Sequence, residues 1–392
     1  MEFKIIKTYK GARLGELKLK HGLVKTPAFV PVATKATVKA LSSEDLECLK
    51  TQLLITNTYH LMLKPGAKII DELGGINEFS GIKTPFMTDS GGFQAFSLGI
   101  GTELGRSKFD YKAKESKQNQ ERIAYITDGG VNFRSIYDQS KHILTPMLSI
   151  ETQHKIGADI ILALDECNAP SADYDTTKQA IIRTHKWAKE CLSHHLKTNK
   201  KSQSIYGIVQ GGLFRDLREE SAKAINKMGF DGFAVGGSFG KKQMYETLSW
   251  INPLLNPKKP KHLLGIGTVE DIFNSVLHGI DTFDCAGPTR IARAGYIHIH
   301  PKSGGNLKNK YRIRISGAKY ITDKSKIDPN CNCEMCKRYT KAYLCHLFRS
   351  QEFLAYKIAS YHNLFFYLDI MAQIRKSIKE KSFDKLYSEW MG

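Results

Sequence analysis

The stretch DIILALDEC, residues 159–167, is a short apolar run that ends in acidic residues. Its length and its lack of alternation indicate a strand that is buried on both faces. Six further runs have the same form, an apolar core that ends in polar or glycine residues: LLITNTYH (53–60), PFMTDSGGFQ (85–94), SIYGIVQGG (204–212), GFAVGG (232–237), HLLGIG (262–267) and GIDTFDC (279–285). Together these runs predict a sheet of buried parallel strands.

Helical patterns separate the runs, for example at residues 42–52, 175–197 and 213–229. Ser42, followed by Asp45, resembles a capping box at the start of the first of these helices. Strands that alternate with helices predict a parallel sheet with crossover helices. No G-x-G-x-x-G opens a helix after the first strand, which weakens the alternative of an open dinucleotide-binding sheet. We therefore expect an α/β fold, a (β/α)8 TIM barrel with a C-terminal zinc-binding subdomain.

The expected domain organisation has four segments. Residues 1–20 alternate like strands and form an N-terminal β segment, and residues 21–300 form the barrel catalytic domain. Residues 301–381 form a basic, zinc-binding subdomain whose helices pack on the barrel, and residues 382–392 form a C-terminal tail.

The chain is strongly basic, with 58 Lys and Arg against 39 Asp and Glu and a formal charge of +19. Such an excess favours a polyanionic partner, but a solvated basic surface explains it equally well, so the charge needs support from a motif. No stretch is long and apolar enough to span a membrane, and the N-terminus lacks the apolar core of a signal peptide. Eight cysteines are too sparse for a disulfide scaffold. We expect a cytoplasmic protein with no membrane contact.

Three of the cysteines lie within six residues, in the spacing C-x-C-x2-C: Cys331, Cys333 and Cys336. Three thiolates this close need a fourth ligand to complete a tetrahedral site. His362 is the preferred fourth ligand, because the flanks of its competitors, Cys345 and His346, indicate a helix face. Four protein ligands leave no open position, so we expect one structural Zn²⁺.

Polar residues gather where the predicted strands end, and in a barrel functional side chains come from the carboxyl ends of the strands. The set consists of Asn57, Asp89, Asp165, Gln210, Gly236–Gly237 and Asp284. Any one of these side chains could cap the helix that follows it. Six of them together are hard to explain by capping.

The two carboxylates Asp89 and Asp284 could divide the work of glycosidic chemistry, one attacking the anomeric carbon and the other moving protons. Asp165 could accept hydrogen bonds from the N–H groups of a planar ligand, and Gln210 could both donate and accept. Phe93 is available for stacking, although a single aromatic residue more often packs in a core.

These motifs resemble, in the same order, those of the tRNA-guanine transglycosylases: TDSGGFQ, DEC, GIVQGG, AVGG, GIDTFDC…PTR and CNCEMC…HN. The resemblance covers the chain from about residue 20 and points to the bacterial type. It implies a (β/α)8 barrel with a zinc subdomain near the C-terminus. It also implies exchange of guanine at the anticodon wobble position (34) of tRNA for a 7-deazaguanine base, queuine or preQ1, in queuosine modification. The implied partners are a tRNA with a GUN anticodon, the free base and a second copy of the chain in a homodimer.

Carried over residue by residue, the resemblance implies that Asp284 is the nucleophile that bonds to ribose C1′. Asp89 would be the general acid/base that protonates the departing guanine and deprotonates the incoming base. Asp165 would hold the N1 and 2-amino edge of the base, while Gln210 and the Gly237 N–H would bind its carbonyl oxygen.

The remaining implied contacts are less direct. Phe93 would stack on the base, Ser90 and Gly240 would line its pocket, and Asn57 and His60 would steady the ribose and the nucleophile. Flanking uridines would be read by Arg290 and Arg293. The implied zinc ligands are Cys331, Cys333, Cys336 and His362.

The chain departs from the family pattern after Gly237. Bacterial members continue with Leu, Ala or Ser, then Val-Gly-Glu, whereas this chain has Ser238, Phe239, Gly240, Lys241 and Lys242. The part that the missing Glu usually plays in base recognition is therefore in doubt. Gly240 resembles the eukaryotic members that use queuine, and the loss of a Val side chain there would open room for the cyclopentenediol of queuine. We therefore favour queuine slightly over preQ1.

Other departures, Gly287 in place of a larger apolar residue and Phe93 in place of a frequent Tyr, do not touch the expected chemistry. Archaeal relatives carry extra C-terminal RNA-binding domains. This chain ends at Gly392, which favours the wobble position.

Two other functions compete with the enzyme. A non-catalytic RNA-binding accessory barrel of the same family would keep the zinc and the charge but could lose the two carboxylates. A metabolic barrel for small molecules, with a structural zinc, would leave the basic charge unexplained. The presence of both Asp89 and Asp284 argues against the accessory barrel.

Overall fold

A computed structural model of the protein describes residues 1–95, 124–199, 202–237 and 241–392. Contacts within the chain divide it into two compact units. The first unit holds residues 56–262 together with Met1, and the second unit holds residues 2–55 and 263–392.

Eight strands form one sheet, in the order β4-β14-β13-β12-β11-β10-β6-β5. Their bounds are β4 Ala28–Pro31, β5 Leu54–Thr56, β6 Phe86–Thr88, β10 Ile160–Leu162, β11 Ser204–Val209, β12 Gly232–Val235, β13 Lys261–Leu263 and β14 Thr282–Cys285. A parallel bridge between Val32 and Ile55 links the ends of the order, next to β4 and β5. The predicted (β/α)8 barrel is therefore confirmed.

The strands are buried along almost their whole length, as their mostly apolar composition predicts, and only Asp284 and Cys285 at the end of β14 are partly exposed. Every residue of β10, β11 and β12 is buried. The seven apolar runs correspond to seven of the strands, but the eighth strand, β4, has only four residues between Pro27 and Val32. Pro27 precedes this strand, Pro31 ends it, and no polar residue follows it directly. It therefore lacks the sequence pattern that identified the other seven strands.

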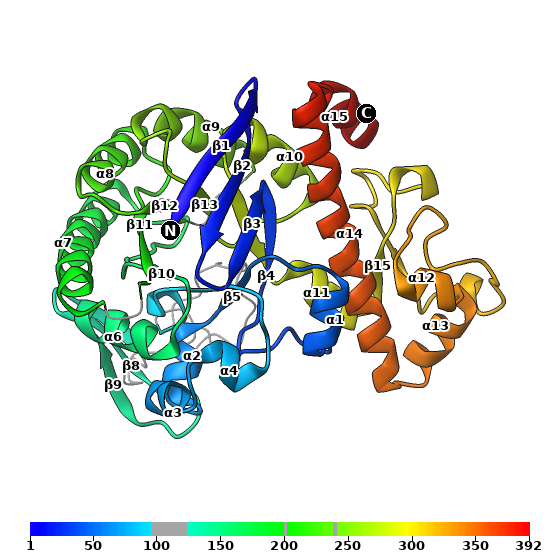
Figure 1. The fold of residues 1–392 in the computed structure, drawn as a ribbon, viewed down its shortest axis with the longest axis horizontal. Coiled ribbons are helices and arrows are strands. Elements are labelled where there is room, and N and C mark those ends of the chain that lie inside the picture. Colours follow the sequence, from blue (N-terminus) through cyan, green and yellow to red (C-terminus); the bar gives the residue numbers. More distant parts are fainter. Residues whose placement is uncertain (96–123, 200–201, 238–240) are drawn as a thin grey trace. The chain divides into compact units, whose positions relative to one another are not determined.

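In the first unit, helices follow the strands and lie outside them, as α7, α8 and α9 do after β10, β11 and β12 (Figure 1). Among its described residues, besides a helical turn at 92–95, this unit has the helices α2 Thr58–Leu63, α3 Ala67–Glu72, α4 Ile76–Ser80, α6 Pro146–Ile156, α7 Tyr174–Thr198, α8 Arg215–Lys227 and α9 Lys241–Ile251, the last followed by a short turn, η1 Asn252–Leu254. A separate antiparallel sheet is formed by β7 Ala124–Thr127, β8 Gly130–Arg134 and β9 Lys141–Leu144.

In the second unit, an antiparallel sheet of β1 Glu2–Tyr9, β2 Ala12–Leu19 and β3 Gly22–Thr26 precedes β4. Its helices are α1 Ser43–Cys48, α10 Val269–Leu277, α11 Gly287–Arg293, α12 Glu334–Arg338, α13 Lys341–Arg349, α14 Phe353–Glu380 and α15 Phe383–Met391. A two-stranded sheet of β15 Tyr296–His298 and β16 Arg312–Arg314 lies beside α14, with short turns at η2 Pro301–Ser303 and η3 Ala318–Tyr320 (Figure 1).

The predicted capping box at α1 is confirmed: the Asp45 N–H donates to the Ser42 hydroxyl, and the Ser42 N–H donates back to the Asp45 carboxylate. None of the helices in the described ranges has both the length and the hydrophobicity that a membrane crossing requires.

A buried ion pair joins the N-terminal sheet to the barrel strand β14. Arg13 on β2 donates through Nε to Asp281 Oδ1 at 3.1 Å and through Nη2 to Oδ2, and the two side chains are 8% and 0% exposed. Asp281 directly precedes β14, and its carbonyl oxygen accepts from the Ala28 N–H of β4. The pair therefore fixes where the N-terminal sheet meets two barrel strands of the second unit.

Replacing Arg13 by Met should destabilise the fold strongly, because Asp281 would be left as a buried charge without its cation. Removing one partner of a buried pair costs roughly 3–5 kcal/mol. Urea unfolding followed by circular dichroism measures the loss in unfolding free energy.

The matched control is Lys10→Ala, because Lys10 pairs with Asp384 at 2.9 Å in an exposed pair. We expect that variant to keep nearly all of its unfolding free energy, because solvent screens an exposed pair. Equal losses of unfolding free energy in the two variants would contradict the prediction that the buried pair stabilises the fold more than the exposed pair does.

Candidate functional site

The Asp89 carboxylate is fixed at the carboxyl end of β6 by donors from the neighbouring strand end. Asn57 follows β5, and its Nδ2 donates to Asp89 Oδ2 at 2.6 Å. The backbone N–H groups of Thr58 and Gly91 donate to Oδ1 at 3.0 and 3.1 Å. Three donors on two oxygens set the orientation of the carboxylate, and Asp89 remains partly accessible.

Asn57 has a second task, because it is the N-cap of α2 and its Oδ1 accepts from the His60 N–H at 3.1 Å. The predicted residues Asn57, His60 and Asp89 thus form one connected group in the first unit. His60 Nδ1 lies 3.1 Å from the hydroxyl of Tyr137, a residue that the sequence did not single out.

A second group of predicted residues surrounds Asp165, three residues after β10. Its Oδ1 accepts from the Ser90 hydroxyl at 3.1 Å and its Oδ2 accepts from Gln210 Nε2 at 2.6 Å. Asp165 and Gln210 are only 7% and 4% exposed. Burial raises the pKa of Asp165 to about 6, although the bonds from Gln210 and Ser90 oppose that rise. The group presents carboxylate oxygens and amide atoms, which match the edge of a planar nucleobase.

The loops that carry Gln210 and Gly237 are held by Arg218 of α8, which is fully buried. Its guanidinium donates to the carbonyl oxygens of Gly212, Val209 and Gly236 at 2.9, 3.1 and 2.8 Å. Burial lowers the pKa of Arg218 to about 9. One side chain therefore ties the loop after β11 to the loop after β12.

Glycines in these loops make the close packing possible. A Cβ on Gly236 would lie 2.4 Å from Gln210 Nε2, and a Cβ on Gly211 would lie 2.7 Å from the backbone nitrogen of Arg218. The Gln210 N–H donates to the hydroxyl of Ser221, also on α8, at 3.2 Å. Gln210 is thus positioned through its backbone by α8 and through its side chain by Asp165.

A small hollow, partly open to solvent, adjoins this group. It is lined by the loop after β10 (166, 168–170), the start of α7 (177, 180–181), and residues 210–213 and 237. Phe93 lies in the helical turn 92–95 and is half-buried. Gly240, which the sequence predicts to line the pocket, belongs to the segment 238–240 and lies outside the described residues.

Asp284 belongs to the second unit and is the third residue of β14. Its Oδ1 accepts from the Gly265 N–H at 2.8 Å, and the side chain is partly exposed. The neighbouring thiol, Cys285, accepts from the Gly287 N–H at 3.2 Å, and burial raises its pKa to about 11. The Cys285 thiol is therefore neutral at physiological pH, and a neutral thiol is a weak nucleophile.

The two arginines of the PTR motif lie on α11, directly after this strand. Arg290 is exposed, and Arg293 is half-buried with its Nη1 donating to the Thr289 carbonyl oxygen at 2.7 Å. They are therefore in the same unit as Asp284 and reach the surface of α11.

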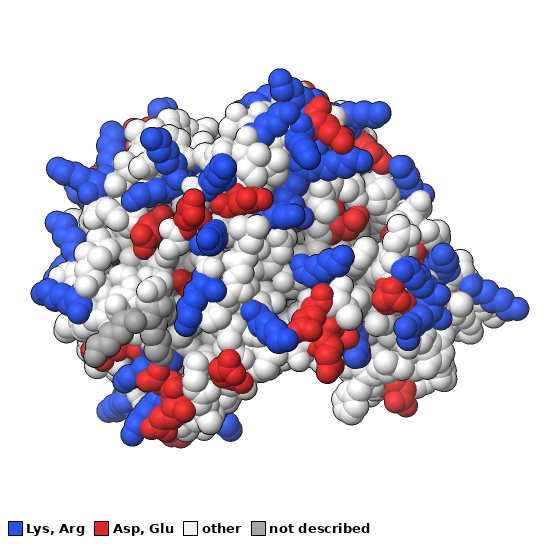
Figure 2. All heavy atoms as spheres, in the orientation of Figure 1, with Lys and Arg blue, Asp and Glu red and all other residues white. Residues whose placement is uncertain are grey.

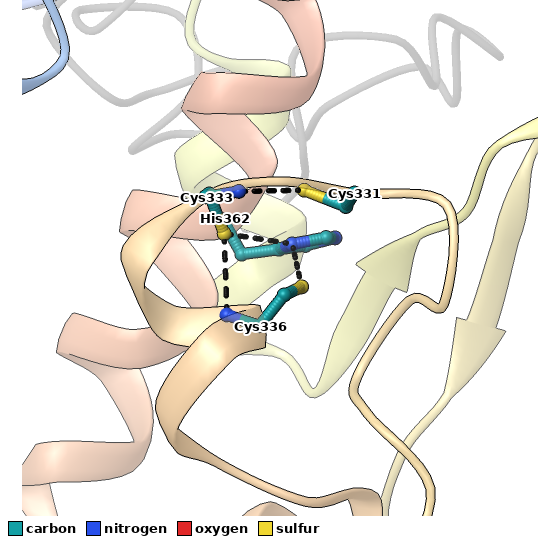
Figure 3. A group of neighbouring side chains, drawn as sticks. All are labelled: Cys331, Cys333, Cys336 and His362. Atoms are coloured by element: carbon teal, nitrogen blue, oxygen red, sulfur yellow. Dashed lines mark hydrogen bonds between the residues drawn. The ribbon is translucent and has the colours of Figure 1, made fainter.

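Three cysteines and a histidine converge near the C-terminus of the second unit (Figure 3). The ligand atoms of Cys331, Cys333, Cys336 and His362 all lie within 4.8 Å of one another, and all four residues are buried. Cys336 Sγ and Cys333 Sγ lie 3.1 and 3.6 Å from His362 Nδ1. This buried group could hold a metal ion, and His362 completes it as the sequence predicted.

The donor set fits a tetrahedral ion. Ligands about 2.0–2.3 Å from a central Zn²⁺ are separated by roughly 3.5 Å, close to the spacing found here. His362 Nε2 lies 2.7 Å from the carbonyl oxygen of His298, so the bond it donates there leaves Nδ1 facing the sulfurs. The competitor Cys345 instead donates to the Gly317 carbonyl oxygen at 3.8 Å.

Asn363, next to His362 on α14, connects the metal group to the elements around it. Its Oδ1 accepts from the His298 N–H at 2.9 Å. Its Nδ2 donates to the carbonyl oxygens of Tyr296 and Pro288 at 2.9 and 3.1 Å. Pro288 belongs to α11, so the metal group supports the loop that follows Asp284.

Comparisons with known proteins agree with this arrangement. Residues 8–392 match the family described as Queuine tRNA-ribosyltransferase. A protein of Archaeoglobus fulgidus is 42% identical over 100% of this chain and 99% of its own length. Two proteins named queuine tRNA-ribosyltransferase, from Halothermothrix orenii and Ruminiclostridium cellulolyticum, are 40% and 41% identical over 97% and 98% of this chain and 94% and 95% of their own lengths.

The match extends over nearly the whole chain and includes the barrel, the strand-end carboxylates and the buried metal group. The chain belongs to the queuine tRNA-ribosyltransferase family, the tRNA-guanine transglycosylases, which are pentosyltransferases that act on tRNA.

Proposed function

We propose that the protein exchanges guanine at the wobble position of a GUN anticodon for a free 7-deazaguanine base, through a covalent bond between Asp284 and the ribose. The observation that carries the proposal is the hydrogen-bonded group of Ser90, Asp165 and Gln210, a buried polar surface shaped for one edge of a purine-like ring. The resemblance of the motifs supplies the position in the tRNA and the identity of the base.

In the first step, an Asp284 oxygen bonds to C1′ while the C1′–N bond to guanine breaks and its electron pair moves onto the base. Asp89 gives a proton to the departing base, which therefore leaves neutral. The incoming base gives its own ring N–H proton to the Asp89 carboxylate as that ring nitrogen attacks C1′ and displaces Asp284, so Asp89 is protonated again. The Gly265 N–H holds the Asp284 carboxylate in place, and three donors hold Asp89.

Base recognition follows from the donors and acceptors of the first unit. Asp165 accepts from N1–H and the 2-amino group, Gln210 and the Gly237 N–H bind the carbonyl oxygen, and Phe93 stacks on the ring. Ser90 keeps the Asp165 carboxylate oriented. Asn57 and His60 steady the ribose from the group around Asp89.

We propose queuine as the preferred incoming base, with preQ1 as its competitor. The sequence supports this preference through Gly240, because a glycine lacks the side chain that Val would place there and so leaves room for the cyclopentenediol of queuine. Exchange of labelled guanine into tRNA measures this preference: the preferred base halves guanine incorporation at the lower concentration.

The tRNA is bound by Arg290 and Arg293 next to the flanking uridines and by the general positive charge. Figure 2 shows Lys and Arg side chains spread over much of the visible face, in line with the net charge of +19. We further propose that the metal is one structural Zn²⁺, that the protein acts as a homodimer, and that it works in the cytoplasm.

Replacing Asp284 by Ala should abolish the covalent intermediate. Incubation of a GUN tRNA with excess free base analogue should give an RNA–protein adduct on a denaturing gel with the unmodified protein and with Asp165→Ala, but none with Asp284→Ala. Exchange of labelled guanine should fall by roughly a thousandfold or more in Asp284→Ala, since loss of a nucleophile removes the whole pathway. If the unmodified protein gives neither adduct nor exchange, the non-catalytic accessory barrel is the correct reading.

Affinity for free guanine should rise as the pH rises through about 6, because Asp165 accepts hydrogen bonds from the base only as a carboxylate. With a pKa of about 6, roughly one carboxylate in eleven is ionised at pH 5, so binding should be about tenfold weaker there than at pH 8. Calorimetric titration measures the affinity. Asp165→Asn should bind weakly at both pH values, and an unchanged pH dependence in that variant would contradict the assignment.

The purified protein should contain one zinc ion per chain, and Cys336→Ala should lose it together with a large part of the thermal stability, because the ion holds α12 against α14. Metal analysis and thermal unfolding measure the two effects. Cys345→Ala, outside the metal group, should keep the ion. Retention of zinc by Cys336→Ala would contradict the proposed ligand set.

A further inference from the structure

An exposed aromatic side chain with a lysine beside it lies close to the Asp89 group and has no part in the function proposed above. Tyr137 lies on the turn between β8 and β9 and is 38% exposed. The exposed Lys64 places its Nζ 5.9 Å from the centre of the Tyr137 ring. His60 meets the ring edge-on, with the centroids 6.3 Å apart. We call these three residues, Tyr137, His60 and Lys64, the Tyr137 platform.

The turn that carries Tyr137 is held rigidly. The Ser135 N–H donates to the Ser140 carbonyl oxygen at 2.9 Å, and the Tyr137 N–H donates to the Ser135 hydroxyl at 3.2 Å. The Ile136 N–H donates to the hydroxyl of Tyr59 on α2 at 3.4 Å. The ring is therefore presented from a fixed backbone, which lowers the entropy that a ligand must overcome to stack on it.

A short chain of hydrogen bonds connects the platform to Asp89. The Tyr137 hydroxyl lies 3.1 Å from His60 Nδ1, the His60 N–H donates to Asn57, and Asn57 donates to Asp89. All four residues belong to the first unit. If Asp89 assists the exchange of a base in RNA, the nucleotides on either side of the exchanged one are therefore within reach of the Tyr137 platform.

The chemistry of the platform suits a single-stranded nucleotide better than a protein or a small anion. The Tyr137 side chain is 38% exposed, so part of its aromatic ring is accessible beside His60 and Lys64. Nucleobases stack on such faces whatever their sequence. Within the part of the chain that is described, Lys64 makes no ion pair, so its ammonium group can pair with a phosphate. The nearby Asp138 carboxylate accepts from the Ser140 hydroxyl at 2.7 Å and is thus engaged within the turn.

We propose that the Tyr137 platform binds a nucleotide adjacent to the exchanged one: the base stacks on Tyr137 and Lys64 pairs with a phosphate. In this arrangement His60 orients the ring. The proposal rests on the proposed function and adds a binding site for RNA on the first unit, separate from the arginines of α11 on the second unit.

The test uses exchange of labelled guanine into RNA hairpins that carry a GUN loop. Tyr137→Ala should raise KM for the hairpin roughly tenfold, the size expected for one lost base stack, and leave KM for guanine unchanged. Tyr137→Phe keeps the ring and should stay within about twofold of the unmodified protein. Lys64→Ala should raise KM for the hairpin and reduce its dependence on salt, since one phosphate contact is lost.

The matched control is Tyr125→Ala, because Tyr125 is a 49% exposed tyrosine on β7 of the same small sheet. We expect its KM for the hairpin to equal that of the unmodified protein. The decisive comparison uses hairpins that lack the base on the 5′ or the 3′ side of the exchanged guanosine. On one of these two hairpins the Tyr137→Ala penalty should vanish, because the stacking partner is already gone.

The inference is overturned if the Tyr137→Ala penalty is the same on every hairpin, or no larger than that of Tyr125→Ala. It is also overturned if Tyr137→Ala and Tyr137→Phe both lower kcat with KM unchanged, since the hydroxyl contact with His60 would then be the part that matters. If the unmodified protein exchanges no guanine, the proposed function fails. If guanine exchange proceeds normally but the Tyr137→Ala penalty does not depend on a flanking base, only the proposed Tyr137 platform is contradicted.

Discussion

The fully buried guanidinium of Arg218 is the constraint on which the base-binding half of the site depends. A buried cation needs hydrogen-bond acceptors, and here backbone carbonyl oxygens from two strand-end loops accept from its Nε and Nη1 groups. Neither loop can move without leaving donors of Arg218 unsatisfied. The positions of Gln210 and Gly237 are therefore set by a helix residue that touches no substrate. The same logic holds in the second unit, where Asn363 fixes β15 and α11 through backbone atoms.

Much of this arrangement could be predicted from the sequence, because a parallel barrel places its polar residues where apolar strands end. Asn57, Asp89, Asp165, Gln210 and Asp284 were found by that rule and do lie at strand ends. The three cysteines were found from their spacing. His362 was preferred to Cys345 and His346 on the helical pattern, and the structure brings it into the metal group. Each of these signals is local, so it survives without knowledge of the tertiary structure.

The residues that the sequence missed act across long distances in the chain. Arg218 lies on the buried face of α8 with Leu217, Ser221 and Ile225. An arginine among apolar positions at helical spacing is a usable sign of a buried cation, but its carbonyl partners could not be named. Tyr137 is one of several exposed tyrosines, and only the fold brings it to His60, 77 residues away. The strand β4 was missed for the opposite reason, since four residues carry too little pattern.

The site also has to be stable when no base is bound, and this explains the bond between Gln210 and Asp165. A dry pocket lined with polar side chains would leave them unsatisfied when empty, at a cost of about 1–3 kcal/mol for each group. In the structure the Gln210 amide donates to Asp165, so each serves as the partner of the other. In the proposed complex, a bound guanine would replace that bond on both sides, since its N–H groups would satisfy Asp165 and its carbonyl oxygen would satisfy Gln210. A base that lacks either group would break the hydrogen bond between Gln210 and Asp165 and leave one of the two side chains without a partner. Such a base would therefore bind more weakly than guanine.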